Sequence, residues 1–324
     1  MKFVYVLVSD SNDCYAEQTY ISMYSLRRSN PGCCIVLATD EPTLQQFEGS
    51  RSLIRDYADE VVCFEVPDGY TTLQRSRHIK TTIRQKITGD FLYLDADTLI
   101  LGDLSDLESV GADIAAIRIQ DGRNWGLTRP HNMLKGYNNM RGIDREEDHG
   151  ISDYHNGGVI LAKDAPAAHA LFESWHRIWS ESSTRYGYHK DQPALWLANR
   201  ENNNVIADLD GKYNMQATCP TVSLQYLGDC RVFHYISTAK YLKNFNLKNR
   251  DFLERLIVSD HSEELDALLD NAKTDYLNGL MILTDPDELN WTHAPLVQIA
   301  RKMSDSFPVL DKLIIKINRL IHKG

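Results

Sequence analysis

Phe91-Leu92-Tyr93-Leu94-Asp95-Ala96-Asp97-Thr98 is the stretch that decides the fold. The apolar residues 91–94 predict a buried strand, and a second apolar run follows at 99–101. We expect Asp95 and Asp97 at the carboxyl edge of an open α/β sheet, where such sheets bind ligands. Side chains two residues apart in an extended segment share a face, so one hard divalent cation can take both carboxylates together with phosphate oxygens. A solvated turn is the alternative for an isolated Asp-x-Asp.

Composition permits an enzyme of ordinary size and argues against a nucleic-acid binder. The chain has 324 residues, of which 43% are hydrophobic, and a formal net charge of −10. Such a chain has no basic excess with which to neutralise a long run of phosphates. A single nucleotide remains compatible, because one metal ion and a few local cations balance its charges.

The N-terminal run and the cysteines both favour a cytoplasmic protein. Asp10 interrupts the first apolar run too soon for a signal peptide, and no apolar run approaches the length of a membrane span. The six cysteines include no Cys-x-x-Cys pair, so we expect reduced thiols in the core and no zinc site.

Alternating strand-like and helix-like segments predict βαβ units, a mainly parallel central sheet and flanking helices, which is an α/β fold. Residues 121–155 are polar and predict a long loop over the site. The expected strands are 3–8, 34–38, 61–66, 91–94, 113–118, 158–162 and a short one at 232–235. The expected helices are 17–29, 42–50, 76–88, 166–180 and 191–200.

The pattern becomes helical from about residue 250, so we divide the chain into a domain at 1–245 and a helical C-terminal extension at 246–324. Residues 309–323 combine an apolar stripe with Lys312, Lys316, Arg319 and Lys323. Either this helix packs on its own domain, or it makes a peripheral contact with an anionic membrane surface at the inner face of the membrane, which we favour.

An ordered set of motifs resembles the family 8 nucleotide-sugar glycosyltransferases, the group of glycogenin and bacterial lipopolysaccharide galactosyltransferases, over roughly residues 1–240. The resemblance implies a GT-A nucleotide-diphospho-sugar transferase fold and metal-dependent transfer of a sugar from a UDP-sugar to an acceptor hydroxyl. It also implies retention of configuration and Mn²⁺, with Mg²⁺ as an alternative. The motifs are Ser9-Asp10 with Tyr15, Ser25-Leu26, Leu92–Thr98, Gly102-Asp103-Leu104, Asn156-Gly157-Gly158-Val159, Asp191-Gln192 and Phe233-His234-Tyr235.

By this resemblance, Asp95, Asp97 and His234 hold the metal against the donor diphosphate. A cation across both phosphates stabilises the charge that develops on the leaving UDP by several kcal/mol. Two carboxylates and an imidazole suit Mn²⁺ better than Mg²⁺, which prefers oxygen ligands. A histidine buried for structural reasons is the alternative for His234.

The resemblance also assigns a donor-binding set. Ser9, Asp10 and Tyr15 are expected at the nucleotide, with Tyr15 either stacking on uracil or serving as a core aromatic. Arg77 or Lys80 is expected to reach the diphosphate or the donor sugar. Ala96 lies between the two metal-binding aspartates, and Lys240 stands where the family carries a lysine, although the surrounding Gly-x-x-Lys-Pro-Trp pattern is missing here.

Two further motifs are expected at the sugar. Asn156-Gly157-Gly158 matches a turn of the family in which glycines let the backbone approach a ligand and Asn156 bonds sugar hydroxyls. A tight turn that only leads into the strand at 158–162 is the alternative. Asp191 and Gln192 open a helix beneath the donor sugar, where Asp191 either attacks the anomeric carbon or fixes hydroxyls. Asp103 is expected to cap a turn.

Two rival functions remain open. A sugar-1-phosphate nucleotidyltransferase should display a Gly-rich phosphate loop near its N-terminus, and residues 9–12 form no such loop. A non-catalytic sugar-nucleotide-binding protein would not need a metal for a leaving group. The sugar and the acceptor, whether saccharide, lipid-linked or protein, cannot be read from these residues, but glycan, lipopolysaccharide or capsule synthesis is the expected setting.

Overall fold

The computed structural model describes residues 1–119, 154–217, 223–235, 249–257 and 262–279, and the single residues 247 and 295. Most of the loop expected at 121–155, Lys240 and the helix expected at 309–323 lie outside these residues. The chain divides into two compact units, Met1–Gly279 and Leu280–Gly324, and the following description concerns the first.

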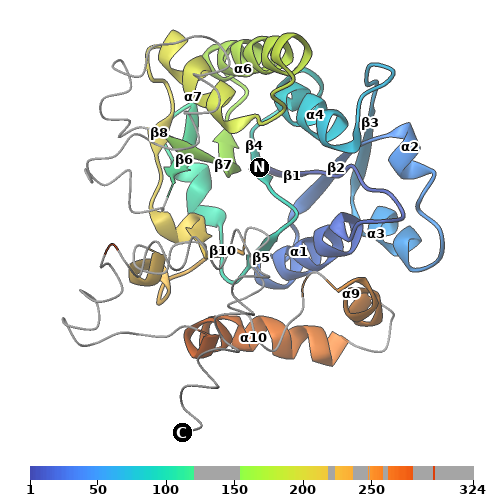
Figure 1. Ribbon diagram of the computed structural model, residues 1–324. Helices are drawn as coiled ribbons and strands as arrows, with labels where there is room; N and C mark the ends of the chain where they lie inside the picture. The colour runs from blue at the N-terminus through green and yellow to red at the C-terminus, as the bar shows by residue number, and fades with distance from the viewer. Residues whose placement is uncertain are drawn as a thin grey trace, which may run out of the picture. The chain divides into compact units, whose positions relative to one another are not determined.

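A seven-stranded sheet forms the centre of the described structure, in the order β3-β2-β1-β4-β7-β6-β8 (Figure 1). Its neighbours pair in parallel except where β7 meets β4 and β6, so the expected mainly parallel sheet is confirmed. The strands are β1 (Lys2–Val6), β2 (Cys34–Asp40), β3 (Glu60–Phe64), β4 (Phe91–Leu94), β6 (Ile114–Arg118), β7 (His155–Ala162) and β8 (Ala207–Asp208).

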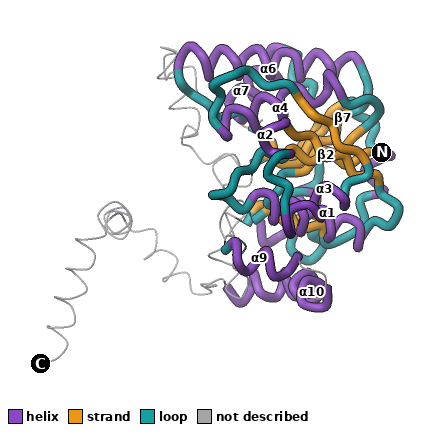
Figure 2. The backbone as a smooth tube through the Cα atoms, turned by 90° about the vertical axis from the view of Figure 1, so that its right-hand side faces the viewer, coloured by secondary structure: helices purple, strands orange, loops and turns teal. Residues whose placement is uncertain are grey.

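Helices cover both faces of this sheet, with α4, α6 and α7 on one side and α1 and α3 on the other (Figure 2). Along β1, alternate side chains enter the two cores: Val4 packs with the first group of helices and Tyr5 with the second. Burial on both faces explains why these strands are almost entirely apolar. The helices are α1 (Tyr15–Ser29), α2 (Glu41–Leu44), α3 (Ser52–Tyr57), α4 (Thr72–Lys86), α6 (Pro166–Tyr186), α7 (Gln192–Glu201), α9 (Arg250–Ile257) and α10 (Ser262–Gly279).

Local signals set the ends of the helices that carry site residues. Thr71 and Gln74 form a capping box at the start of α4, which satisfies two backbone N–H groups there. Helix α6 begins at Pro166 and ends at Tyr186, and Gly187 caps it with a φ of 65°, the left-handed conformation that glycine adopts most easily.

A smaller sheet, in the order β5-β10-β9, lies beside the large one and contains β5 (Thr98–Ile100), β10 (Val232–His234) and β9 (Met215–Gln216). Strand β10 runs antiparallel to β5 and parallel to β9. Strands β4 and β5 are separated only by residues 95–97, so the Asp-x-Asp segment joins the two sheets. Short 3-10 turns occur at Gly49–Arg51, Ser105–Ser109, Gly211–Tyr213 and Leu224–Tyr226.

Two expected elements differ from the structure. The helix expected at 42–50 is the single turn α2, capped by Asp40, and the chain then passes through Gly49 at a φ of 58° before α3 begins. The turn expected at Asn156-Gly157 is wrong, because β7 begins at His155 and includes both residues. Paired residues flank this polar segment: His155 pairs with Arg118 of β6, and residues 159–162 pair with β4.

Helices α9 and α10 confirm that the chain turns helical near residue 250, and both belong to the first compact unit. Arg28 of α1 forms ion pairs with Asp266 at 3.1 Å and Asp270 at 2.7 Å on α10. None of the helices in the described part of the chain is long and apolar enough to cross a membrane.

The cysteines match their expected state only in part. None of the five cysteines in the described residues forms a disulfide. Only Cys230 among them is buried, and Cys63 is exposed, so the expectation of core positions is wrong for most of them. Cys219 lies outside the described residues.

Candidate functional site

Sheet topology brings the candidate residues to one edge. Strands β1 and β4 are parallel neighbours, so Ser9 and Asp95 follow strand ends at the same side of the sheet. Strand β7 runs the opposite way and starts at that side. The backbone N–H of Asp95 donates to the Gly158 carbonyl at 2.8 Å, which fixes β7 beside the acidic pair.

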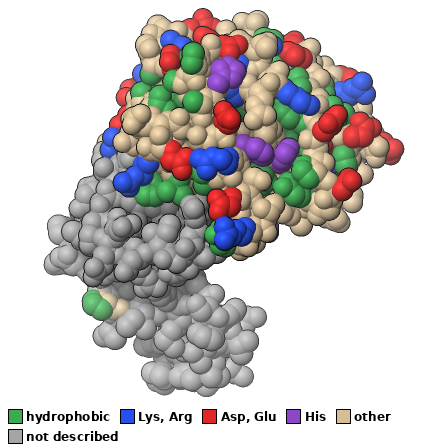
Figure 3. Space-filling view, turned by 90° about the horizontal axis from the view of Figure 1, so that it is seen from above, with side chains coloured by type: hydrophobic (Ala, Val, Ile, Leu, Met, Phe, Trp, Pro, Cys, Tyr) green, Lys and Arg blue, Asp and Glu red, His purple; other side chains and the backbone are tan. Residues whose placement is uncertain are grey.

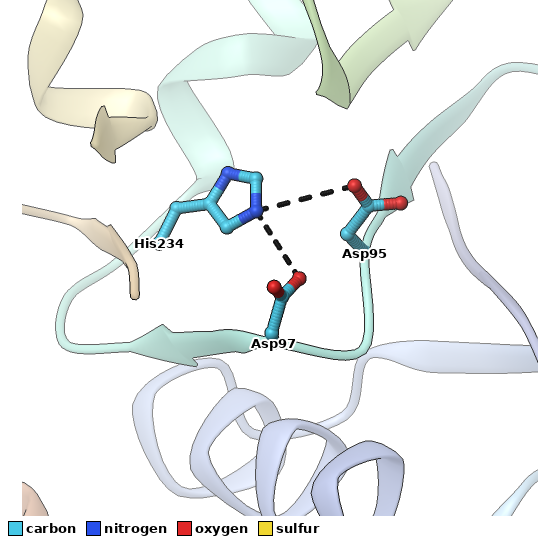
Figure 4. A group of neighbouring side chains, drawn as sticks. All are labelled: Asp95, Asp97 and His234. Atoms are coloured by element: carbon cyan, nitrogen blue, oxygen red, sulfur yellow. Dashed lines mark hydrogen bonds and ion pairs between the residues drawn. The ribbon is translucent and has the colours of Figure 1, made fainter. Parts of the chain in front are cut away.

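Strand pairing in the small sheet carries His234 to the same place. Thr98 of β5 pairs with His234 of β10, so the histidine lies one register position from Asp97. His234 Nε2 is 3.1 Å from Asp97 Oδ1 and 4.0 Å from Asp95 Oδ2 (Figure 4). One ligand atom from each of the three residues lies within 4.8 Å of the others, which is close enough for one ion.

The backbone between the two aspartates is not the extended segment that we expected. Residues 96 and 97 form a turn, because the chain leaves one sheet at β4 and enters the other at β5. The carboxylates converge through this turn, not through a shared strand face. Ala96 lies in the turn and is half-buried.

Asp95 also contacts a buried cation. Lys80 Nζ donates to Asp95 Oδ1 at 3.0 Å, and the Tyr93 hydroxyl donates to the same oxygen. The ammonium group lies 4.7 Å from the centre of the Tyr93 ring. Burial raises the pKa of Tyr93 well above its ordinary value, and the neighbouring Asp95 carboxylate raises it further, so the phenol stays protonated and donates.

Asp191 completes a chain of charges with the same lysine. Its Oδ2 is 3.5 Å from Lys80 Nζ, and its Oδ1 is 2.9 Å from Arg77 Nε. Burial acts to raise the pKa of Asp191, but the charges of Arg77 and Lys80 outweigh it and hold that pKa below the usual range. Both basic residues proposed from the sequence therefore reach the site, and each contacts a carboxylate there.

Helix α7 positions Asp191 at its N-terminus. Trp175 Nε1 donates to the Asp191 carbonyl at 2.9 Å, which ties this end of α7 to α6. Gln192 is the first residue of the helix, and its Nε2 is buried without a hydrogen-bond partner among the described residues. A bound ligand could accept from this nitrogen.

Asn156 is buried in strand β7 near His234 and does not lie in an open turn. Its Oδ1 accepts from Gly158 N at 2.8 Å and from Asn214 Nδ2 at 2.9 Å. Asn214 Oδ1 is 2.9 Å from His234 Nδ1. Sequence reasoning gave Asn214 no role.

Of the two glycines in the Asn156-Gly157-Gly158 motif, Gly158 is the one that allows a close approach. A Cβ on Gly158 would lie 2.3 Å from His234 Cε1 and 2.8 Å from Asp95 Oδ2. A Cβ on Gly157 would come no closer than 3.7 Å to the nearest atom, Lys80 Nζ. Motif matching could not separate the two, because the relevant neighbours come from other strands.

The segment after β1 is organised by Asp13, which sequence reasoning missed. Asp13 accepts from Ser9 Oγ at 2.5 Å, Asp10 N at 2.9 Å and Tyr15 N at 3.1 Å. An aspartate shortly before a helix commonly binds nearby backbone N–H groups, and that was the available signal. Tyr15 begins α1 and is half-exposed, so the alternative of a core aromatic is wrong.

Asp103 serves as a turn cap, as expected. Its carboxylate accepts from the backbone N–H of Ser105 at 2.9 Å and from the Ser105 hydroxyl at 2.7 Å. It is therefore not a third ligand beside the acidic pair.

The model of glycosyl transferase family 8 matches residues 6–241 of this chain. The chain belongs to glycosyl transferase family 8.

Two solved structures resemble this family 8 member. The glycosyltransferase GlyE of Streptococcus pneumoniae TIGR4 is 20% identical with a TM-score of 0.50, over 84% of this chain and 64% of GlyE. The bifunctional glycosyltransferase WbbM is 14% identical with a TM-score of 0.53, over 82% of this chain and 51% of WbbM.

At these identities the likeness concerns the fold alone, and it confirms the expected GT-A architecture for this family 8 member. The chain spans about two thirds or less of the length of these relatives. No curated protein matches its sequence.

Proposed function

We propose that this family 8 member transfers a sugar from a UDP-sugar to an acceptor hydroxyl, with Mn²⁺ preferred over Mg²⁺. The observation that carries this proposal is the convergence of Asp95, Asp97 and His234 at the ligand-binding edge of the sheet. Two carboxylates and one imidazole form a donor set that fits Mn²⁺. When bound, the ion supplies positive charge that stabilises the departing diphosphate.

The neighbouring residues fit the remaining tasks. Arg77 and Lys80 are cations within reach of a donor phosphate or sugar, and Lys80 is buried enough for its charge to act at low dielectric. Asp191 faces both cations, and we assign it to the anomeric centre of a retaining transfer. Tyr15, half-exposed beside Asp13, is assigned to the uracil.

The net charge of the chain favours a small nucleotide ligand over a nucleic acid. Acidic and basic side chains are interspersed over the face seen from the side of α6 (Figure 3), and the chain as a whole carries −10. We therefore propose a small nucleotide-sugar donor, with an acceptor from glycan, lipopolysaccharide or capsule synthesis.

A donor screen that measures UDP release with Mn²⁺ tests the proposal. Asp97→Ala should lower the transfer rate by about a hundredfold or more, because several kcal/mol of charge stabilisation are lost. Asp103→Ala is the matched control, since the Asp103 carboxylate binds Ser105 and lies outside the acidic pair, and this variant should transfer at the wild-type rate.

Three results would contradict the proposal. Full transfer in EDTA, or by Asp97→Ala, would exclude the metal assignment. Formation of a UDP-sugar and pyrophosphate from UTP and a sugar 1-phosphate would indicate a nucleotidyltransferase. Tight binding of a UDP-sugar with no turnover towards any acceptor or water would indicate a binding protein.

A further inference from the structure

Three buried polar side chains form a row behind the acidic pair. His234 Nδ1 is 2.9 Å from Asn214 Oδ1, and Asn214 Nδ2 donates to Asn156 Oδ1 at 2.9 Å. The row ends at the backbone N–H of Gly158, which donates to the same Asn156 oxygen at 2.8 Å. Asn214 is fully buried and His234 is 2% exposed, so water does not compete for these bonds.

One backbone group determines the direction of every bond in this row. A peptide N–H can only donate, so the Asn156 atom that faces Gly158 N is the carbonyl oxygen and not the amide nitrogen. An oxygen can only accept here, so the Asn214 atom that faces it is the amide nitrogen. Asn214 therefore presents its own oxygen to His234, and that oxygen requires a proton on Nδ1.

We propose that this row of hydrogen bonds, the amide relay, holds His234 with Nδ1 protonated and Nε2 directed at the paired carboxylates. A histidine binds a metal through the ring nitrogen that has a free lone pair, and the bond at the other nitrogen decides which one that is. Nε2 is the nitrogen 3.1 Å from Asp97 Oδ1. The inference rests on the proposed metal-dependent function, and it makes Asn156 and Asn214 positioning residues for His234 instead of ligands of the sugar.

The relay also predicts the effect of removing one of its two asparagines. Without the Asn156 oxygen, the amide of Asn214 can turn over and offer its NH₂ group to Nδ1. The ring then carries its proton on Nε2, which removes the lone pair that the ion needs. Loss of such a partner typically weakens metal binding by about 10- to 100-fold.

Isothermal titration with Mn²⁺ alone, without donor, tests the relay. Asn156→Leu and Asn214→Leu should bind Mn²⁺ about 10- to 100-fold more weakly than the wild type. Their Mg²⁺ affinity should change less, because Mg²⁺ relies on oxygen ligands.

Asn199→Leu is the matched control for the loss of a buried asparagine. Asn199 Oδ1 also accepts a backbone N–H, from Ile206 at 2.9 Å, but Asn199 does not belong to the relay. This variant should keep wild-type Mn²⁺ affinity, so a general loss of stability can be told apart from loss of the relay.

Nitrogen-15 spectra of the protein loaded with diamagnetic Cd²⁺ give a second readout, with the proton of His234 expected on Nδ1. A proton on Nε2, or wild-type Mn²⁺ affinity in Asn214→Leu, would overturn the relay and leave the proposed transfer standing. Failure of the wild type to bind Mn²⁺ would overturn the relay and the metal assignment together. Mn²⁺ binding as expected without sugar transfer would contradict only the proposed reaction.

Discussion

Gly158 contributes to the candidate site in two ways, through its backbone N–H and through its lack of a side chain. Its N–H fixes the orientation of Asn156, and its missing side chain leaves room for the His234 ring. A Cβ on Gly158 would lie 2.3 Å from His234 Cε1, a distance shorter than real Cβ contacts show. Because the ring is buried, either the ring or strand β7 would have to move. The residue therefore couples the position of β7 to that of the histidine.

We expect Gly158→Ala to weaken Mn²⁺ binding by at least about tenfold, because a displaced histidine no longer completes the ligand set. Titration calorimetry measures this directly. Gly157→Ala is the adjacent control, since its new Cβ would meet only ordinary contacts of 3.7 Å or more. Equal affinities for the two variants would show that the close approach at Gly158 has no bearing on the ion.

Asp191→Asn removes one negative charge and nearly preserves the shape of the side chain. Because we assign Asp191 to the anomeric centre, the loss of its charge should lower turnover much more than donor affinity. UDP release gives turnover, and titration with the UDP-sugar gives affinity. NMR assignment of the new linkage in the wild-type product tests retention separately, and an inverted linkage would contradict it.

The elements that the sequence predicts well are those buried on both faces. Strands such as β1 and β4 are nearly continuous apolar runs, so both the strands and the position of Asp95 could be predicted. The prediction of a helix at 42–50 was wrong, because α2 already ends at Leu44 and a turn follows it. Short strands such as β5 and β9 carry too few residues to show a period.

The prediction of the candidate site depended more on the resemblance to a family than on local sequence patterns. Asp97 and His234 are 137 residues apart in sequence, and only the pairing of β5 with β10 brings them together. No local rule predicts such a pairing. The role of Asn214 was missed for the same reason, since its partners lie on β10 and β7.

Arg51, in the turn at Gly49–Arg51, links helix α1 to the segment after β1. Arg51 donates to both carboxylate oxygens of Glu17, at 2.5 and 3.0 Å. The same guanidinium group donates to the carbonyls of Asp10 at 2.7 Å and Asp13 at 2.9 Å. Arg51 thus holds in place the segment after β1, to which we assign the nucleotide.

Arg51→Met should destabilise the protein by about 3–5 kcal/mol, because it leaves the buried carboxylate of Glu17 without its charge partner. Urea unfolding measures the loss. Replacing both residues by methionine should recover part of it. The exposed pair Arg177–Glu201 is the control, and Arg177→Met should change stability by less than about 1 kcal/mol.

At the scale of the whole molecule, the basic end of the chain stays a prediction, because residues 309–323 lie outside the described part. A chain truncated after Asp305 should lose binding to anionic vesicles, since it loses Lys312, Lys316, Arg319 and Lys323. Each contributes on the order of 1 kcal/mol near such a surface. Liposome co-sedimentation measures the binding, and the truncated chain should still transfer sugar to a soluble acceptor.

Either equal sedimentation of the two forms or no binding by the full chain would discard the membrane contact. In both cases the alternative of a helix packed on its own domain would be favoured.

The division of the Asp-x-Asp segment between two sheets has a consequence for the order of assembly. Lys80 and Asp95 are 15 residues apart, so their contact needs only a short loop to close. Asp97 meets its imidazole partner across 137 residues, and contacts of such separation form slowly. During synthesis on the ribosome, the nascent chain must therefore extend past β10 before it can bind the proposed ion. Until then the set of ligands for the ion is incomplete.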